Sequence, residues 1–237
     1  MTPHADLRER VFEANRDLVR AGLVVLTFGN ASGVDRSAGV MAIKASGVAY
    51  DQLHPEAMVL VDVESGDTIE TRYKPSSDTP THLVLYRRFA AVGGIVHTHS
   101  PYATAWAQAR REIPCLGTTH ADHFRGSVPV TRPLTGGEIQ GDYEASTGDV
   151  IVETLERLEL DPLEMPAVLV ASHGPFAWGA DVMHAVENAV ALEAVATTAL
   201  HTVMLEAEAD RIEDDLLQRH YLRKHGSTAY YGQPHRS

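Results

Sequence analysis

The sequence predicts a layered α/β fold that forms one domain over residues 1–237. Three observations support this prediction. Strand-like and helix-like segments are interspersed along the chain, which is typical of folds in which helices cover a sheet. A chain of 237 residues can bury a large core. No linker, low-complexity tract or repeat divides it, although Thr135-Gly136-Gly137 marks a local turn.

The first half of the chain begins with a helix predicted over 6–20, where Leu7, Val11, Ala14 and Leu18 recur at helical spacing before Gly22. Strands are expected around 40–43 and 58–63, followed by a turn at 64–67.

Two helices are then predicted by similar start signals. Ser77-Asp78-Thr79-Pro80 is typical of a helix N-cap followed by proline, and this helix should reach about residue 89. An apolar strand at 92–96 follows, and Ser100-Pro101 repeats the start signal for a helix to about 109. The rest of the chain predicts helices near 149–158, 181–206 and 210–224, and a buried strand at 167–171.

Composition excludes several function classes. Lys and Arg number 20 against 32 Asp and Glu, and the net charge of −12 repels nucleic acid and anionic lipid. Cys115 is the only cysteine, so no disulfide forms within the chain. The charged N-terminus is unlike a signal peptide, and no run approaches about 18 apolar residues. We therefore expect a soluble cytoplasmic protein with no membrane and no nucleic-acid partner.

A pair of histidines is the most informative local feature. His97-Thr98-His99 ends the apolar run Val92-Gly-Gly-Ile-Val96, and side chains at i and i+2 of a strand point the same way. Neutral imidazole is a common ligand for zinc and similar divalent ions. Alone, the pair could equally be two half-buried or surface histidines. His173 after the apolar run at 167–171, together with Asp78, could complete a site around one cation.

Asp78 has a second interpretation, because a helix N-cap also favours aspartate, and the two roles can coexist. Three small-residue loops contain Thr27 to Gly33, Lys44 to Gly47, and Lys74 to Ser77. Each could simply reverse the chain. Together, with Lys44 as a point charge and the helix N–H groups after Ser77, they have the chemistry needed to hold a phosphate in an acidic protein.

For two further segments, residue spacing alone does not decide between a functional and a structural role. The run Gly117-Thr-Thr-His-Ala-Asp-His123 is dense in titratable groups, although such a run is ordinarily a solvated loop. Tyr230-Tyr231 near the end of the chain would usually be surface packing or a disordered tail.

These motifs together resemble the L-ribulose-5-phosphate 4-epimerases of the class II aldolase and adducin superfamily. The resemblance spans nearly the whole chain. The matching residues are Gly29-Asn30, Ser46-Gly47, Lys74 to His82, Gly93 to Ser100, Gly117 to Asp122, Ser172 to Gly179, His220 to Gly226 and Tyr230 to Gln233. The superfamily shares the His-X-His pair, whereas the Asp122 loop and the C-terminal tyrosines resemble the epimerases in particular.

The resemblance implies a three-layer α/β/α fold with a central, mostly antiparallel sheet. It implies C4 epimerisation of L-ribulose 5-phosphate to D-xylulose 5-phosphate by retro-aldol and aldol steps, in carbohydrate metabolism and arabinose catabolism. It further implies a homotetramer with active sites at subunit interfaces. The implied cofactor is a divalent metal, first Zn²⁺, with Mn²⁺ or Co²⁺ as alternatives.

The resemblance also implies residue roles. Asp122 and Tyr231 would be the acid/base pair. The metal ligands would be His97, His99 and His173, with Asp78 in or against the coordination shell. The substrate-binding residues would be Gly29, Asn30, Lys44, Ser46, Gly47, Ser76 and Ser77. Three positions depart from the family pattern: Phe28 replaces tryptophan, Ala45 replaces proline, and His123 replaces an aromatic residue.

Other functions remain as alternatives. A sugar-phosphate aldolase of the same superfamily would use the same metal but release its products, and would not need Asp122 and Tyr231. A metal-dependent oxygenase of the cupin kind also uses His-X-His, a carboxylate and a later histidine. A non-enzymatic adducin-like scaffold is disfavoured, because a scaffold has no need of the three histidines.

Overall fold

A seven-stranded antiparallel sheet forms the centre of the computed structural model, which describes residues 4–70, 72–226 and 229–230. The strand order is β4-β3-β2-β1-β5-β7-β6. The strands are β1 (Asn30–Asp35), β2 (Val40–Lys44), β3 (Met58–Asp62), β4 (Thr68–Glu70), β5 (Gly94–His97), β6 (Ala167–Leu169) and β7 (Pro175–Gly179). The central pair, β1 and β5, aligns Asn30 with His97. This register places the first residue of one strand beside the last residue of the other.

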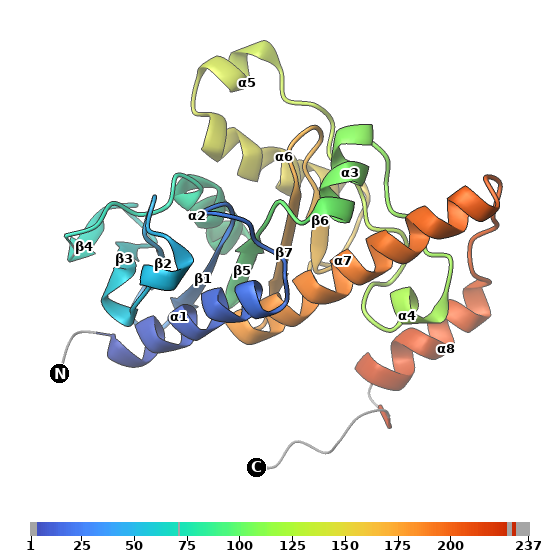
Figure 1. Cartoon of the computed structure of the whole chain (residues 1–237), viewed down its shortest axis with the longest axis horizontal. Helices are drawn as coiled ribbons and strands as arrows, with labels where there is room; N and C mark the ends of the chain where they lie inside the picture. Colours follow the sequence, from blue (N-terminus) through green and yellow to red (C-terminus); the bar gives the residue numbers. More distant parts are fainter. Residues whose placement is uncertain (1–3, 71, 227–228, 231–237) are drawn as a thin grey trace.

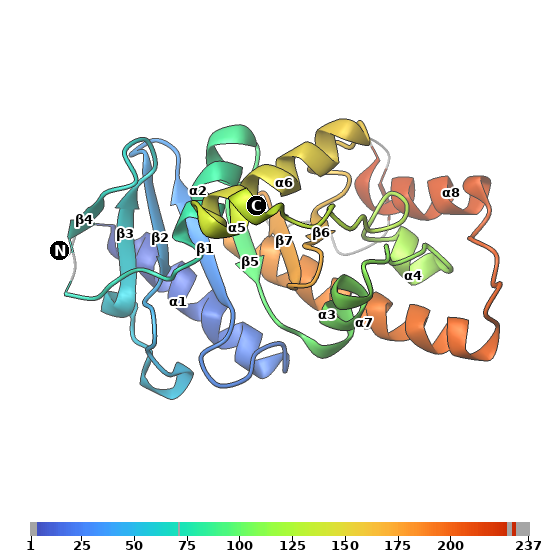
Figure 2. The ribbon, with the colours of Figure 1, turned by 90° about the horizontal axis from the view of Figure 1, so that it is seen from above.

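Helices cover both faces of the sheet and give the expected three layers (Figures 1 and 2). α1 and α7 lie on one face, and α2 and α6 on the other. The α-helices are α1 (Ala5–Arg20), α2 (Thr79–Arg88), α3 (Pro101–Ala109), α4 (Thr118–Ala121), α5 (Gly136–Gln140), α6 (Tyr143–Arg157), α7 (Val182–Leu205) and α8 (Asp214–His225). Two 3-10 turns, Tyr50–Gln52 and Pro55–Ala57, precede β3.

Local sequence patterns explain several of these elements. α1 buries Leu7, Val11, Ala14 and Leu18, the residues that recur at helical spacing. The beginning of β5 passes close to the loop before α7, where a Cβ on Gly93 would lie only 2.0 Å from the Ala180 carbonyl oxygen. Glycine is therefore required there by close packing rather than by turn conformation.

The structure differs from the sequence expectation in several elements, including the short helices α4 and α5, which the sequence predicts as a loop and a turn. The segment expected to be a turn, 27–33, instead leads into β1, because Asn30 to Asp35 pair with both β2 and β5. β7 was not expected at all. α6 begins at Tyr143 rather than near 149, and this earlier start brings its first turn to the functional site described below.

α7 has 24 residues and is apolar enough to cross a membrane by length and composition alone, although Glu187 and Glu193 interrupt its apolar runs. In the structure this helix packs lengthwise on β5 and β7 and buries Val186, Ala189, Leu192, Val195 and Ala196 (Figure 1). α4 and α8 pack against each other at the periphery, beyond the end of the sheet (Figure 1).

Candidate metal and phosphate site

A cavity of about 360 Å³ opens where β1 begins and β5 ends. Every residue that the sequence suggested for metal or substrate binding lines it: Gly29, Asn30, Lys44, Ser46, Gly47, Ser76, Ser77, Asp78, His97, His99 and His173. These residues come from loops that are far apart in the sequence. The sheet brings them together because the start of β1, the end of β2 and the end of β5 lie at the same end of the sheet.

Three imidazoles meet in this cavity. The ligand nitrogens of His97, His99 and His173 all lie within 4.8 Å of one another. His97 Nδ1 lies 2.9 Å from the Pro175 carbonyl oxygen, and because a carbonyl only accepts, Nδ1 carries the proton and Nε2 presents its lone pair. His97 Nε2 faces His99 Nε2 at 3.1 Å. Burial lowers the pKa of all three, that of His173 to about 4, so they are neutral near pH 7.

This arrangement fits a divalent metal. Neutral imidazoles present lone pairs to a common point, and the Pro175 carbonyl fixes the ring of His97 as a partner outside the coordination shell commonly does. His173 Nδ1 is buried and has no hydrogen-bond partner among the described residues. A buried ring nitrogen that lacks a partner costs free energy of folding, and a bound metal ion would supply that partner. The three histidines therefore form a site that could hold a metal ion.

Asp78 lies beside the histidines but does not cap α2. Its side chain makes no capping hydrogen bond, and its Oδ2 instead accepts one from Asn30 Nδ2 at 2.6 Å. Burial acts to raise the pKa of Asp78, but the electrostatic influence of the adjacent His97 and His82 rings and the bond from Asn30 outweigh it and lower the pKa. Asp78 is therefore a carboxylate at neutral pH. Of the two interpretations of this residue, the capping role is wrong.

Lys44 supplies a buried positive charge. Its side chain is only 2% exposed, and its Nζ lies 4.8 Å from the centre of the Tyr50 ring. Burial lowers the pKa of Lys44. Within the described part of the chain no carboxylate forms an ion pair with it. A buried ammonium without an anionic partner is unfavourable, so this group is suited to binding an anion.

Backbone conformation shapes the part of the cavity wall formed by the loop before β1. Gly29 has φ +81°, and a Cβ there would lie 2.8 Å from the carbonyl oxygen of His97. Any other residue would be strained and would collide with the strand that bears the histidines. The Tyr50 hydroxyl donates to the Gly29 carbonyl at 2.9 Å, which ties the loop before β1 to the lysine side of the cavity.

Sequence patterns missed two residues of the cavity. Tyr143 and Glu144, the first residues of α6, also line it. The Tyr143 ring centroid lies 6.3 Å from that of His173, and the Glu144 carbonyl accepts a hydrogen bond from Thr81 Oγ1 at 2.6 Å. No spacing relates them to the other residues of the site. They reach the site because α6 begins at Tyr143, six residues earlier than the sequence pattern predicts.

Asp122 does not line this cavity within its own chain. It follows α4 and is held by α8: Arg223 Nη2 donates to Oδ2 at 2.6 Å, and His220 Nδ1 lies 3.1 Å from Oδ1. Partial burial acts to raise the pKa of Asp122, but the bonds from Arg223 and His220 outweigh it and lower the pKa. Tyr231, its expected partner, lies outside the described residues.

The structure shows the contacts of the three residues that depart from the family pattern, Phe28, Ala45 and His123. Phe28 lines the cavity with its ring 6.1 Å from His99. The Ala45 N–H donates to the Ala57 carbonyl at 3.0 Å, a bond that proline could not make. His123 has its Nε2 3.2 Å from Lys224 Nζ, so it joins the contact between α4 and α8.

Comparison with known proteins defines the class. The profile described as "Class II Aldolase and Adducin N-terminal domain" matches residues 9–200, and the chain belongs to this family. An L-ribulose-5-phosphate 4-epimerase UlaF of Salmonella paratyphi B is 53% identical over 227 residues, covering 96% of this chain and 98% of the relative. The protein of the same name from Salmonella typhi has the same identity and coverage.

Solved structures agree with the fold. An L-fuculose 1-phosphate aldolase superposes with a TM-score of 0.76 at 24% identity, covering 91% of this chain and 94% of the other. The L-fuculose-1-phosphate aldolase of Thermus thermophilus gives a TM-score of 0.67 at 24% identity, covering 88% of this chain and 100% of the other. These similarities confirm the expected class II aldolase fold.

Proposed function

We propose that the protein is a metal-dependent L-ribulose-5-phosphate 4-epimerase that forms D-xylulose 5-phosphate. The observation that carries this proposal is a single cavity lined both by three neutral imidazoles and by a buried lysine that forms no ion pair with any described residue. That pairing fits a substrate with one phosphate and a neighbouring carbonyl and hydroxyl. The 53% identity to proteins named as this epimerase, over 96% of the chain, supports the same choice.

The substrate dictates the chemistry. The hydrogen at C4 is not next to the C2 carbonyl, so it is not acidified and direct proton abstraction is unfavourable. Breaking the C3–C4 bond avoids this difficulty, because the electron pair is delocalised into the C2 carbonyl and gives an enediolate. The other fragment is glycolaldehyde phosphate. Re-addition to the opposite face of its aldehyde gives the C4 epimer.

His97, His99 and His173 would hold the cation, with Asp78 in or against its shell. We propose Zn²⁺ first, and Mn²⁺ or Co²⁺ as alternatives. When bound, a divalent ion supplies Lewis-acid stabilisation of the negative charge that develops at C2 and C3. The chain also aligns these ligands, because the Pro175 carbonyl fixes the proton of His97 on Nδ1.

The phosphate would lie on the opposite side of the cavity. Lys44 supplies the positive charge, and the two serines that precede α2, Ser76 and Ser77, supply hydroxyl groups. Gly29, Asn30, Ser46 and Gly47 complete this set. Within this set Asn30 would contact a substrate hydroxyl and not the phosphate itself, because its Nδ2 already donates to Asp78 and Ser76 and its Oδ1 can only accept. Holding the phosphate keeps the aldehyde in place while it rotates to present its other face.

Two proton-transfer groups are needed because the C4 oxygen points in opposite directions in the two epimers. We propose Asp122 and Tyr231 for these roles. Since Asp122 lies on the peripheral α4–α8 contact of its own chain, we further propose a cyclic homotetramer in which neighbouring subunits complete each site. We place the enzyme in the cytoplasm, in carbohydrate metabolism, with arabinose catabolism as the first pathway to examine.

The deciding experiment incubates purified protein with L-ribulose 5-phosphate and follows D-xylulose 5-phosphate, with and without a chelator. We expect conversion that the chelator abolishes and added Zn²⁺, Mn²⁺ or Co²⁺ restores. Accumulation of free glycolaldehyde phosphate without the epimer would instead indicate an aldolase. Oxygen uptake after addition of Fe²⁺, without conversion of the sugar phosphate, would indicate the oxygenase alternative.

A further inference from the structure

The loop between the sheet and α6 is held by polar contacts rather than by a core. Thr131 is buried, and its N–H donates to the Leu169 carbonyl at 2.8 Å. From Arg132 to Ser146 no residue is buried, and α5, within this stretch, buries none of its side chains. Leu134 is half-buried against the core, whereas Ile139 of α5 is 55% exposed. We call residues 133–142 the α5 loop, which projects away from the sheet in Figure 1.

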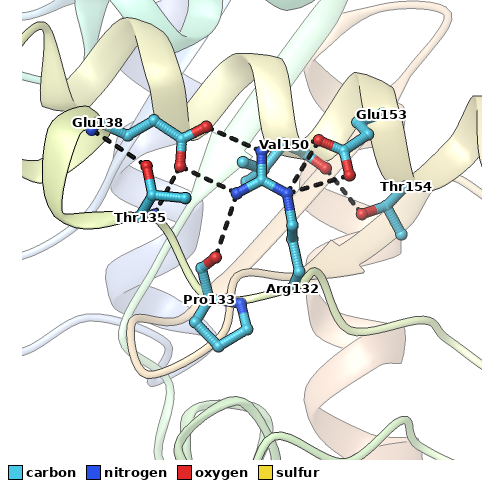
Figure 3. Close-up of polar contacts among 7 residues, drawn as sticks. All are labelled: Arg132, Pro133, Thr135, Glu138, Val150, Glu153 and Thr154. Atoms are coloured by element: carbon cyan, nitrogen blue, oxygen red, sulfur yellow. Dashed lines mark hydrogen bonds and ion pairs between the residues drawn. The ribbon is translucent and has the colours of Figure 1, made fainter.

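The guanidinium of Arg132 makes ion pairs on both sides, one within this loop and one with helix α6. Arg132 donates to both carboxylate oxygens of Glu138 in α5, at 2.8 and 2.9 Å. On its other edge it donates from Nε and Nη2 to Glu153 of α6, at 2.8 to 3.0 Å. It also donates to the Pro133 carbonyl at 3.2 Å. Figure 3 shows the guanidinium lying between the two carboxylates.

The start of α5 belongs to the same network. Glu138 Oε2 also accepts from the Thr135 N–H at 2.6 Å, and Thr135 Oγ1 accepts from the Glu138 N–H. The bonds from Arg132, with those from Thr135, lower the pKa of Glu138 to about 2, so the carboxylate stays charged at every pH at which the enzyme would work. Arg132 thus links side chains of the α5 loop and of helix α6.

The position of this loop affects the cavity directly. Residue 142 ends the loop, and the next two residues, Tyr143 and Glu144, line the cavity beside His173. Asp142 makes no side-chain cap on α6, so the helix does not fix its own first turn in that way. Exposed ion pairs contribute little to global stability, but a network with bidentate geometry can fix a local conformation.

We propose that Arg132 is a positioning residue: by clamping Glu138 to Glu153 it holds the α5 loop as a lid, and so places Tyr143 and Glu144 around a bound sugar phosphate. A loosened lid reduces the fraction of molecules that can bind substrate, and the apparent affinity falls by that fraction. Molecules with substrate bound still turn over. Loss of the clamp should therefore raise KM far more than it lowers kcat.

The test compares Arg132→Gln with Arg88→Gln. The control breaks an exposed pair between α2 and Glu156 of the same helix α6, away from the α5 loop. For Arg132→Gln we expect KM to rise about fivefold with kcat within about twofold of wild type, and deuterium uptake in 133–142 to be about fivefold faster. Arg88→Gln should change neither. Arg132→Lys should give an intermediate KM, since an ammonium cannot chelate both carboxylates.

Unchanged deuterium uptake in 133–142 would overturn the proposal. So would a lower kcat with unchanged KM, or faster uptake throughout the protein, because either result indicates a loss of folded enzyme instead of a local effect. The kinetic comparison rests on the proposed function, whereas the uptake comparison does not. Absence of epimerase activity in the wild type would therefore overturn the function while the exchange data still decide the role of Arg132.

Discussion

The cavity at one end of the central strands and the cluster around Asp122 differ in the elements that position their side chains. The cavity residues lie at the ends of central strands and in the loops beside them; Lys44 and His97 are each only 2% exposed, whereas His99 is exposed. The Asp122 cluster lies between two peripheral helices, and its side chains are 14 to 23% exposed. α8, which supplies Arg223 and His220, buries only Tyr221.

This difference suits the two regions to different roles. Groups that must keep a fixed geometry, the histidines and the phosphate-binding loops, are placed by the sheet of one chain. Asp122, the carboxylate that we propose for proton transfer, instead lies on peripheral helices, outside the cavity of its own chain. Substitutions in the cavity and in the Asp122 cluster should therefore have separable effects.

The largest effect should follow removal of a histidine. We expect His97→Asn to lose bound metal and to lower kcat/KM by about 10³-fold, because the charge that develops in the transition state then loses its stabilisation. The fold should survive, since an open site contributes less to folding than a closed structural one. Metal content, activity and thermal unfolding measure this. His184→Asn, at the opposite end of the sheet, is the control. A variant that is already unfolded at room temperature would contradict a catalytic role.

The second effect tests whether the two regions come from different chains. Asp122→Asn and Tyr231→Phe should each lower activity by about 10²-fold or more, as loss of a general acid or base does. If neighbouring subunits combine the two groups, co-refolding the variants at equal ratio should restore about one intact site in four. No recovery, with mixed tetramers confirmed by mass, would place Tyr231 in the site of its own subunit or outside catalysis.

The third effect concerns the phosphate side of the cavity. We expect Lys44→Met to raise KM about tenfold, the usual magnitude for a lost charge-assisted bond. It should also release free glycolaldehyde phosphate, because an aldehyde that is not anchored escapes before it can rotate. Steady-state kinetics and an aldehyde trap measure both. If KM and product partition are unchanged, the phosphate binds elsewhere.

Local patterns predicted the parts of the molecule that depend on short-range periodicity. α1 and the His97–His99 pair follow from helical and strand spacing, because neighbouring positions alone decide which face a side chain occupies. β1 was missed because its sequence, Asn-Ala-Ser-Gly-Val-Asp, has weak strand propensity. Pairing with β2 on one side and β5 on the other makes it a strand, and such long-range pairing leaves no local signal.

The same distinction applies to the site. The loops that contain Lys44 and Ser76 could be recognised by composition, although only the sheet brings them to one cavity. Tyr143 and Glu144 could not, since they reach the cavity through the position of the α5 loop and not through a motif. The contact of Asp122 with Arg223 joins residues far apart in the sequence, and spacing could not reveal it.

The smallest effect concerns the pKa of Asp122. Arg223 stabilises its carboxylate form, so Arg223→Gln should raise that pKa. A base with a raised pKa loses its charged form at a higher pH, and the acid limb of the pH profile of kcat/KM should therefore move to higher pH. Arg219→Gln, an exposed arginine of the same helix, should leave the profile in place. If Arg223→Gln also leaves the acid limb where it is, then either Asp122 does not set that limb or Arg223 leaves Asp122 when a neighbouring subunit binds. Repeating the profile with Asp122→Asn distinguishes the two, because only in the second case does the limb itself disappear.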